Sequence, residues 1–91
     1  MAHPVRNNPS QNRFELETEA GLAVADYRLA DGAMTIFHTH VPVVLRQRGV
    51  GSCLVRAALE DARSRGLKVI AQCWFVSDFL KRHPEFNDLA R

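Results

Sequence analysis

The segment Arg46–Ser52, called the basic loop below, constrains this chain more than any other because it joins an apolar extended run to a helical pattern. Its sequence is Arg-Gln-Arg-Gly-Val-Gly-Ser. Gly49 and Gly51 lack the Cβ atoms that would keep a ligand off the backbone, so several amides can converge on one anion where the helix begins. Arg46 and Arg48 add positive charge there. The pattern therefore predicts a phosphate site, and an ordinary strand-to-helix turn is the alternative.

Length and composition restrict the class of protein further. With 91 residues, of which 46% are hydrophobic and 24% charged, the chain predicts one globular domain. A net charge of +2 is too small to indicate a nucleic-acid partner. The sequence shows neither a run of about 20 apolar residues nor a secretory signal, which predicts a cytoplasmic location and no membrane partner. Cys53 and Cys73 are expected to be reduced thiols.

The first half of the chain carries strand patterns. Residues 1–12 contain prolines and asparagines without apolar periodicity and are expected to form a flexible leader, with the domain proper spanning residues 13–91. Arg13–Thr18 alternates with a period of two, as a half-buried strand does. A second strand is expected over Leu22–Leu29. Asp31-Gly32 indicates a hairpin, after which Met34–Val41 returns as a third antiparallel strand.

The second half changes to helical periodicity. Gly51–Arg65 has apolar residues at steps of three and four and predicts a helix, which Gly66 ends. Leu67–Cys73 is short and apolar and is expected to lie parallel to the third strand through a right-handed crossover. Val76–Arg82 predicts a last short helix, ended before Pro84. The expected fold is α/β with a mixed sheet: a three-stranded antiparallel meander, a helix, a parallel strand and a short C-terminal helix.

Around the basic loop, the segments Phe37–Pro42, Cys53–Arg63, Gly66–Cys73 and Phe79–Phe86 follow in the order strand, helix, strand and helix. Together with the loop they resemble the GNAT acetyltransferase superfamily, and in particular its short, single-domain, cysteine-containing members. The resemblance covers most of residues 12–91. It implies a GNAT-like acetyltransferase domain over residues 13–91.

The resemblance also implies a cofactor, acetyl-CoA, in which pantetheine lies between two separating strands and the pyrophosphate lies on the loop amides. Ligands of open α/β sheets collect beyond the carboxyl ends of parallel strands, and Pro42 cannot donate to a ladder, so strand pairing is expected to fail there. Gln47 stands where short relatives commonly carry glycine. The expected cofactor-binding residues are Val41, Val43, Arg46, Gln47, Arg48, Gly49, Val50, Gly51 and Ser52.

Acetyl transfer to an amine needs a base and a proton donor near the thioester. His40, at the end of the third strand, is the expected base. Cys73, at the end of the parallel strand, is expected to donate a proton or to carry the acyl group. The alternative is that Cys73 packs in the core as a small apolar side chain and has no chemical role. Glu85 is a weaker third choice. His38 and His40 are spaced to share one strand face, which leaves a metal site open as a minor alternative, although no metal is expected.

These observations predict an acetyl-CoA-binding N-acetyltransferase in which an amine attacks the thioester directly in a ternary complex. The expected partner is an amine acceptor, either a small molecule or a protein lysine, and the expected state is a monomer or a homodimer. A non-catalytic acyl-CoA-binding or protein-interaction module is the alternative from another class. A small structural α/β domain with an incidental glycine turn is the third.

Overall fold

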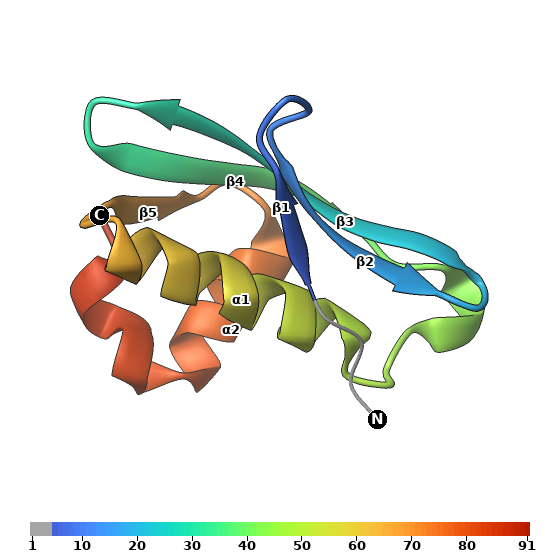
Figure 1. The fold of residues 1–91 in the computed structure, drawn as a ribbon. Coiled ribbons are helices and arrows are strands. Elements are labelled where there is room, and N and C mark those ends of the chain that lie inside the picture. The colour runs from blue at the N-terminus through green and yellow to red at the C-terminus, as the bar shows by residue number, and fades with distance from the viewer. Residues whose placement is uncertain (1–4) are drawn as a thin grey trace.

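The computed structural model describes residues 5–91, in which one mixed sheet carries two helices on the same side (Figure 1). The strands follow the order β1-β2-β3-β4-β5 across the sheet. Two 3-10 segments, Val43–Leu45 and Pro84–Leu89, join the regular elements. Those elements are β1 (Arg6–Asn8), β2 (Arg13–Thr18), β3 (Gly21–Ala30), β4 (Ala33–His40), α1 (Val50–Ser64), β5 (Lys68–Ala71) and α2 (Trp74–Arg82).

The strand directions confirm the expected α/β fold with a mixed sheet. β2, β3 and β4 form the antiparallel meander, and β5 pairs with β4 in parallel after the crossover through α1. Asp31 and Gly32 both have positive φ angles, 53° and 73°, which matches the two-residue hairpin turn between β3 and β4. Gly66, with φ of 70°, follows the end of α1 as a left-handed C-terminal residue.

The antiparallel part of the sheet has one strand more than the sequence indicated. Arg6–Asn8 forms β1 and pairs with β2, whereas the sequence analysis placed these residues in a leader without regular structure. Side-chain hydrogen bonds hold this edge strand: the Tyr27 hydroxyl donates to Asn7 Oδ1 at 2.7 Å, and the Asn8 amide donates to Glu15 at 3.0 Å. Such long-range polar contacts leave no periodicity in a sequence. Residues 1–4 of the expected leader lie outside the described residues.

The boundaries around β5 also differ from the expectation. β5 ends at Ala71 rather than Cys73, and α2 begins at Trp74 rather than Val76. The Gln72 and Cys73 amides both donate to the Ile36 carbonyl, at 3.0 and 3.3 Å, so the ladder cannot continue. The chain therefore leaves the sheet at Gln72, and Cys73 becomes the N-cap of α2.

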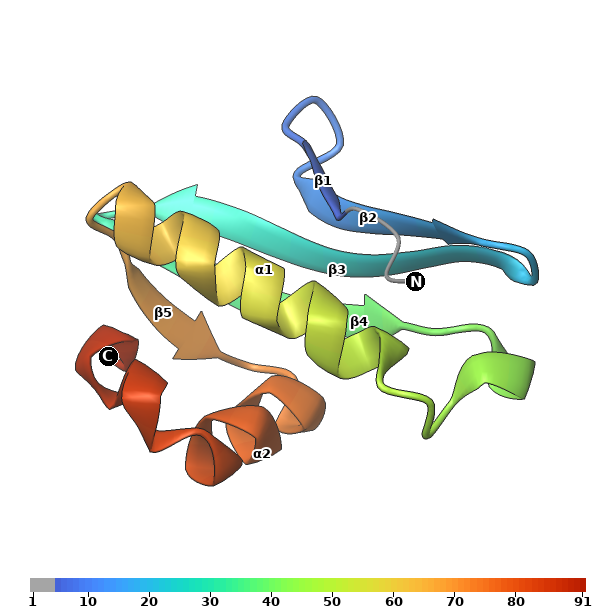
Figure 2. The ribbon, with the colours of Figure 1, turned by 60° about the horizontal axis from the view of Figure 1, so that its bottom comes forward.

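α1 lies across one face of the sheet (Figure 2), and the core lies between the two. One face of α1 is fully buried and contacts the inner face of β2, β3 and β4. α2 and the C-terminal 3-10 segment close the core beside β5 with Val76, Phe79, Phe86 and Leu89. Within residues 5–91, no helix is long and apolar enough to cross a membrane. The buried residues of α1 are Gly51, Leu54, Val55, Ala58, Leu59 and Ala62.

Candidate functional site

A β-bulge in β4 organises the site. The register with β3 shifts between Asp26 and Tyr27: Tyr27 pairs with Ile36, but Asp26 pairs with His38, which leaves Phe37 as an extra residue. One extra residue reverses the inward and outward alternation of everything that follows it in the strand. The side chains after Phe37 therefore exchange faces relative to a regular strand.

The exchange brings Thr39, rather than its histidine neighbours, to the inner face. Thr39 is opposite the fully buried Ala25 and so shares its face. His40 is opposite Val24 on the outer face and is exposed. His38 lies on the outer face with Asp26, and their side chains are 2.9 Å apart.

Beyond the bulge, β4 and β5 separate. Their parallel pairing ends with Ile36 opposite Ala71, so the rest of β4 and the following Val41 have no strand on the β5 side among the described residues. The sequence analysis expected pairing to fail at Pro42 because proline cannot donate. The pairing fails several residues earlier, because the bulge and the two amides on the Ile36 carbonyl end it.

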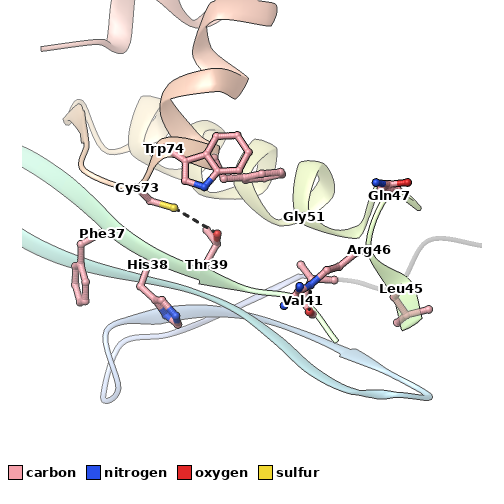
Figure 3. A pocket seen from close by; sticks show the side chains of 11 residues that line it. Phe37, His38, Thr39, Val41, Leu45, Arg46, Gln47, Gly51, Cys73 and Trp74 are labelled. Carbon is pink, nitrogen blue, oxygen red and sulfur yellow. Dashed lines mark hydrogen bonds between the residues drawn. The ribbon is translucent and has the colours of Figure 1, made fainter. Parts of the chain in front are cut away.

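A cavity of about 560 Å³ occupies this gap (Figure 3), a size typical of small-molecule sites. It extends from the separated strands to the basic loop, so one continuous space joins an unpaired strand edge to the start of α1. The indole of Trp74 is exposed. The lining residues are Phe37, His38, Thr39, Val41, Leu45, Arg46, Gln47, Gly51, Cys73, Trp74 and Phe75.

The basic loop ends at an uncapped helix N-terminus. Gly49 is the N-cap of α1 with a φ of 81°, no side chain makes a cap hydrogen bond, and the first turn contains no acidic residue. The first helical hydrogen bond is donated by Cys53 to Gly49, at 3.0 Å, so the amides of Val50–Ser52 precede it. Arg46 and Arg48, in the loop that precedes these amides, are exposed. Free amides and the positive end of the helix dipole favour an anion at such a helix start, and nearby guanidinium groups add to this preference.

Gly51 has a packing role that the sequence did not indicate. A Cβ at this position would lie 2.8 Å from the Phe75 ring and 3.5 Å from the Val41 side chain. The absence of a side chain therefore lets Phe75 close the inner wall of the cavity against α1. Gly51 thus serves the packing of the cavity wall, and its role in ligand approach stays a prediction, whereas Gly49, which has open space around it, has the positive φ that the turn requires.

Cys73 is half-buried at the junction of β5 and α2 and lines the cavity. Its Sγ lies 3.5 Å from the Thr39 hydroxyl. Burial by itself raises the pKa of this thiol, but the Thr39 hydroxyl and the Phe75 and Val76 amides lower it more, so the pKa is below its ordinary value. α2 has no side-chain cap hydrogen bond, yet its first amides favour negative charge on the sulfur.

Comparison with known proteins identifies the family. Residues 13–89, most of the chain, match the family described as GCN5-related N-acetyl-transferase. This chain belongs to that family. The GCN5-related domain also resembles the solution structure of a GCN5-like protein from Staphylococcus aureus, with a TM-score of 0.77 and 31% identity over 97% of this chain and 87% of that one.

Among curated relatives of this GCN5-related domain, Protein NATD1 from Homo sapiens is 36% identical over 47 residues, which are 52% of this chain and 42% of the human protein. Protein NATD1 from Danio rerio is 33% identical over 54 residues, 59% of this chain and 49% of the fish protein. The chain thus spans less than half the length of these relatives.

The residues that the sequence predicts for the site of this GCN5-related domain differ in their position relative to the cavity. Val41, Arg46, Gln47 and Gly51 line the cavity with Cys73. Arg48, Gly49, Val50 and Ser52 lie in the same loop and first turn of α1, and Val43 lies in an exposed 3-10 turn.

The predicted base and its alternatives lie elsewhere. His40 is not brought to Cys73, because the bulge turns it to the outer face. Glu85 contacts Arg56 on α1 at 3.5 Å and does not line the cavity. Within residues 5–91, no group of three or more His, Cys, Asp or Glu side chains is arranged to hold a metal. The sequence analysis missed Thr39, because only the register of β4 against β3 shows its direction.

Proposed function

We propose that this protein binds acetyl-CoA and transfers the acetyl group to an amine. The single observation that supports this best is the continuous cavity between the separated strands and the uncapped start of α1. Membership in the GCN5-related family supports an acyl-CoA ligand. The acceptor, a small amine or a protein lysine, and the assembly as a monomer or homodimer are parts of the same proposal.

The residues present fit the cofactor. The amides of Val50–Ser52 with Arg46 and Arg48 would hold the pyrophosphate, because nothing acidic lies in the first turn of α1. The free edge of β4 and the adjoining Val41 would pair with the pantetheine amides as a neighbouring strand would. Val43, at the exposed turn beyond this edge, would contact the cofactor from outside the cavity. When bound, acetyl-CoA supplies an activated acetyl thioester.

Proton transfer in this proposal belongs to Cys73. It is the thiol that lines the cavity, and its lowered pKa brings its titration closer to neutral pH than that of an ordinary thiol. His40 faces away from the cavity, so we give it no part in proton transfer here. The Trp74 and Phe75 rings line the α2 side of the cavity.

Calorimetric titration with acetyl-CoA tests the binding half of the proposal. We expect Gly49→Glu to abolish saturable binding, because a carboxylate at the N-cap of α1 repels the pyrophosphate. Gly66→Glu is the matched control: Gly66 also has a positive φ, 70°, and open space around its Cα, but it lies at the opposite end of α1. The control should bind as the parent does. Equal binding by the parent and Gly49→Glu would refute the loop assignment.

Turnover separates an enzyme from a binding module. The parent protein would be mixed with acetyl-CoA and a panel of amines that includes polyamines and lysine peptides, and release of the free coenzyme A thiol would be followed. We expect Cys73→Ala to bind acetyl-CoA normally and to release thiol at least about tenfold more slowly, as removal of a proton-transferring group does. Binding without turnover on any amine would instead favour the non-catalytic acyl-CoA-binding module.

A further inference from the structure

Thr39 and Cys73 approach each other across the gap between β4 and the start of α2. Figure 3 shows their side chains pointing toward one another, and the distance from Oγ1 to Sγ is 3.5 Å. Both residues are half-buried and both line the cavity. This contact joins two elements that do not pair at this level, since the β4–β5 ladder ends at Ile36 and Ala71.

The direction of this hydrogen bond follows from the chemistry of the two groups. A threonine hydroxyl always carries a proton to donate, whereas an ionised sulfur can only accept. The Phe75 and Val76 amides at the start of α2 also favour an ionised sulfur. When the sulfur is ionised, the hydroxyl therefore donates to Sγ, and the sulfur receives hydrogen-bond donors from β4 on one side and from α2 on the other.

Other charged groups do not account for this environment. Among the described residues, the titratable or charged side chains that line the cavity with Cys73 are those of His38 and Arg46. His38 is held by Asp26 on the outer face, and Arg46 donates to the Val41 carbonyl at 3.2 Å. Neither makes a hydrogen bond to the sulfur.

We propose that Thr39 is a positioning residue for Cys73: the Thr39 hydroxyl holds the Cys73 sulfur in the cavity as a hydrogen-bond acceptor. The β-bulge at Phe37 is what makes this possible, because without it His38 and His40 would face inward and Thr39 outward. The consequence for turnover rests on the proposed acetyltransferase function. The effect on the sulfur itself does not, since it belongs to the protein without ligand.

Alkylation of Cys73 by iodoacetamide tests the inference directly. Cys53→Ser, which removes the exposed thiol on α1, leaves Cys73 as the one cysteine of the chain. The alkylation rate would be measured against pH in this background, with and without Thr39→Val. We expect Thr39→Val to move the midpoint of the profile upward by about one pH unit, the size of one hydrogen bond to a charged group. Thr39→Ser, which keeps a hydroxyl, should restore the midpoint of the parent.

Thr35→Val is the matched control, because it makes the same change in β4 before the bulge and Thr35 does not line the cavity. Its midpoint should equal that of the parent. Far-UV circular dichroism would establish that each variant is folded, and Thr39→Ala replaces Thr39→Val if the latter is not. A midpoint that is unchanged in the folded Thr39→Val or Thr39→Ala protein would overturn the inference.

Titration of the parent protein with acetyl-CoA separates this inference from the proposed function. The parent is used for this measurement because Thr39 itself lines the cavity in which acetyl-CoA is proposed to bind. If Thr39→Val shifts the midpoint but the parent binds no acetyl-CoA, the role of Thr39 is sustained and the proposed function is refuted. If the parent binds acetyl-CoA and Thr39→Val leaves the midpoint unchanged, the role of Thr39 is refuted and the proposed function is sustained.

Discussion

At the scale of single residues, Gln47 carries a conformational cost in the basic loop. Its φ of 68° lies in the left-handed region that favours glycine. Glycine, which adopts this conformation without strain, is the residue that the family resemblance places at this position. The structure supplies the physical reason, since the chain must turn between the 3-10 segment Val43–Leu45 and the N-cap Gly49.

Gln47→Gly is expected to stabilise the protein by about 0.5–1 kcal/mol, because relief of left-handed strain exceeds the added entropy of glycine in the unfolded chain. Urea unfolding would measure the change. Gln11→Gly is the control: Gln11 is also exposed in a loop but has no positive φ, so this change should lower stability. A Gln47→Gly protein less stable than the parent would contradict the assigned strain.

At the scale of elements, Glu15 holds the edge strand β1 to β2. Its buried carboxylate accepts from Arg13 Nε at 2.7 Å and from the Asn8 amide at 3.0 Å, and Arg6 lies 3.5 Å away. Hydrogen bonds from Arg13 and Asn8 lower the pKa of Glu15, against the opposing effect of burial. Two of its three partners belong to β1, which explains how a strand of this length stays in place.

Glu15→Gln should therefore lower stability by about 1–2 kcal/mol at pH 7. The folded state holds the carboxylate ionised to lower pH than the unfolded chain does, so the stabilisation is present above the ordinary pKa of 4.5 and is lost as the pH falls through the folded value. Unfolding by urea at pH 7 and pH 3 would show the difference between parent and variant shrinking at the lower pH. Glu17→Gln, at an exposed position of β2, should change little at either pH. A difference that grows toward pH 3 would contradict this role.

At the scale of the whole molecule, the site lies where three separate parts of the chain meet. β4 contributes an unpaired edge, the basic loop contributes the uncapped start of α1, and the junction of β5 and α2 contributes Cys73. The core holds these parts together through α1, which is buried along one face from Gly51 to Ala62. The cavity is thus a consequence of the packing of α1 and α2 on a sheet whose last two strands separate.

Ligand binding should protect this region and leave the far hairpin unaffected. With acetyl-CoA added, we expect slower amide hydrogen exchange in residues 37–41 and in Val50–Ser52, because the ligand would cover the free strand edge and the start of α1. The hairpin at Asp31-Gly32 should exchange at an unchanged rate. Gly49→Glu should abolish the protection. Slowing spread evenly over the sheet would speak against a ligand in this cavity.

The sequence was sufficient for the elements whose causes are local. The hairpin at Asp31-Gly32 and the end of α1 at Gly66 both depend on residues that tolerate positive φ, and α1 itself depends on apolar periodicity. Strand β1 was missed because its ties are side-chain hydrogen bonds to distant residues, such as Asn7 with Tyr27.

For the candidate site, the sequence by itself determined the chemical content: a basic glycine loop before a helix and a cysteine after the last strand. The tertiary structure alone decided which side chains face the cavity. A single extra residue, Phe37, puts Thr39 on the inner face and His40 on the outer face. Gly51 is required by the Phe75 ring that packs on it. Both are decided by the register and packing of segments far apart in the chain, and such contacts have no local signature in the sequence.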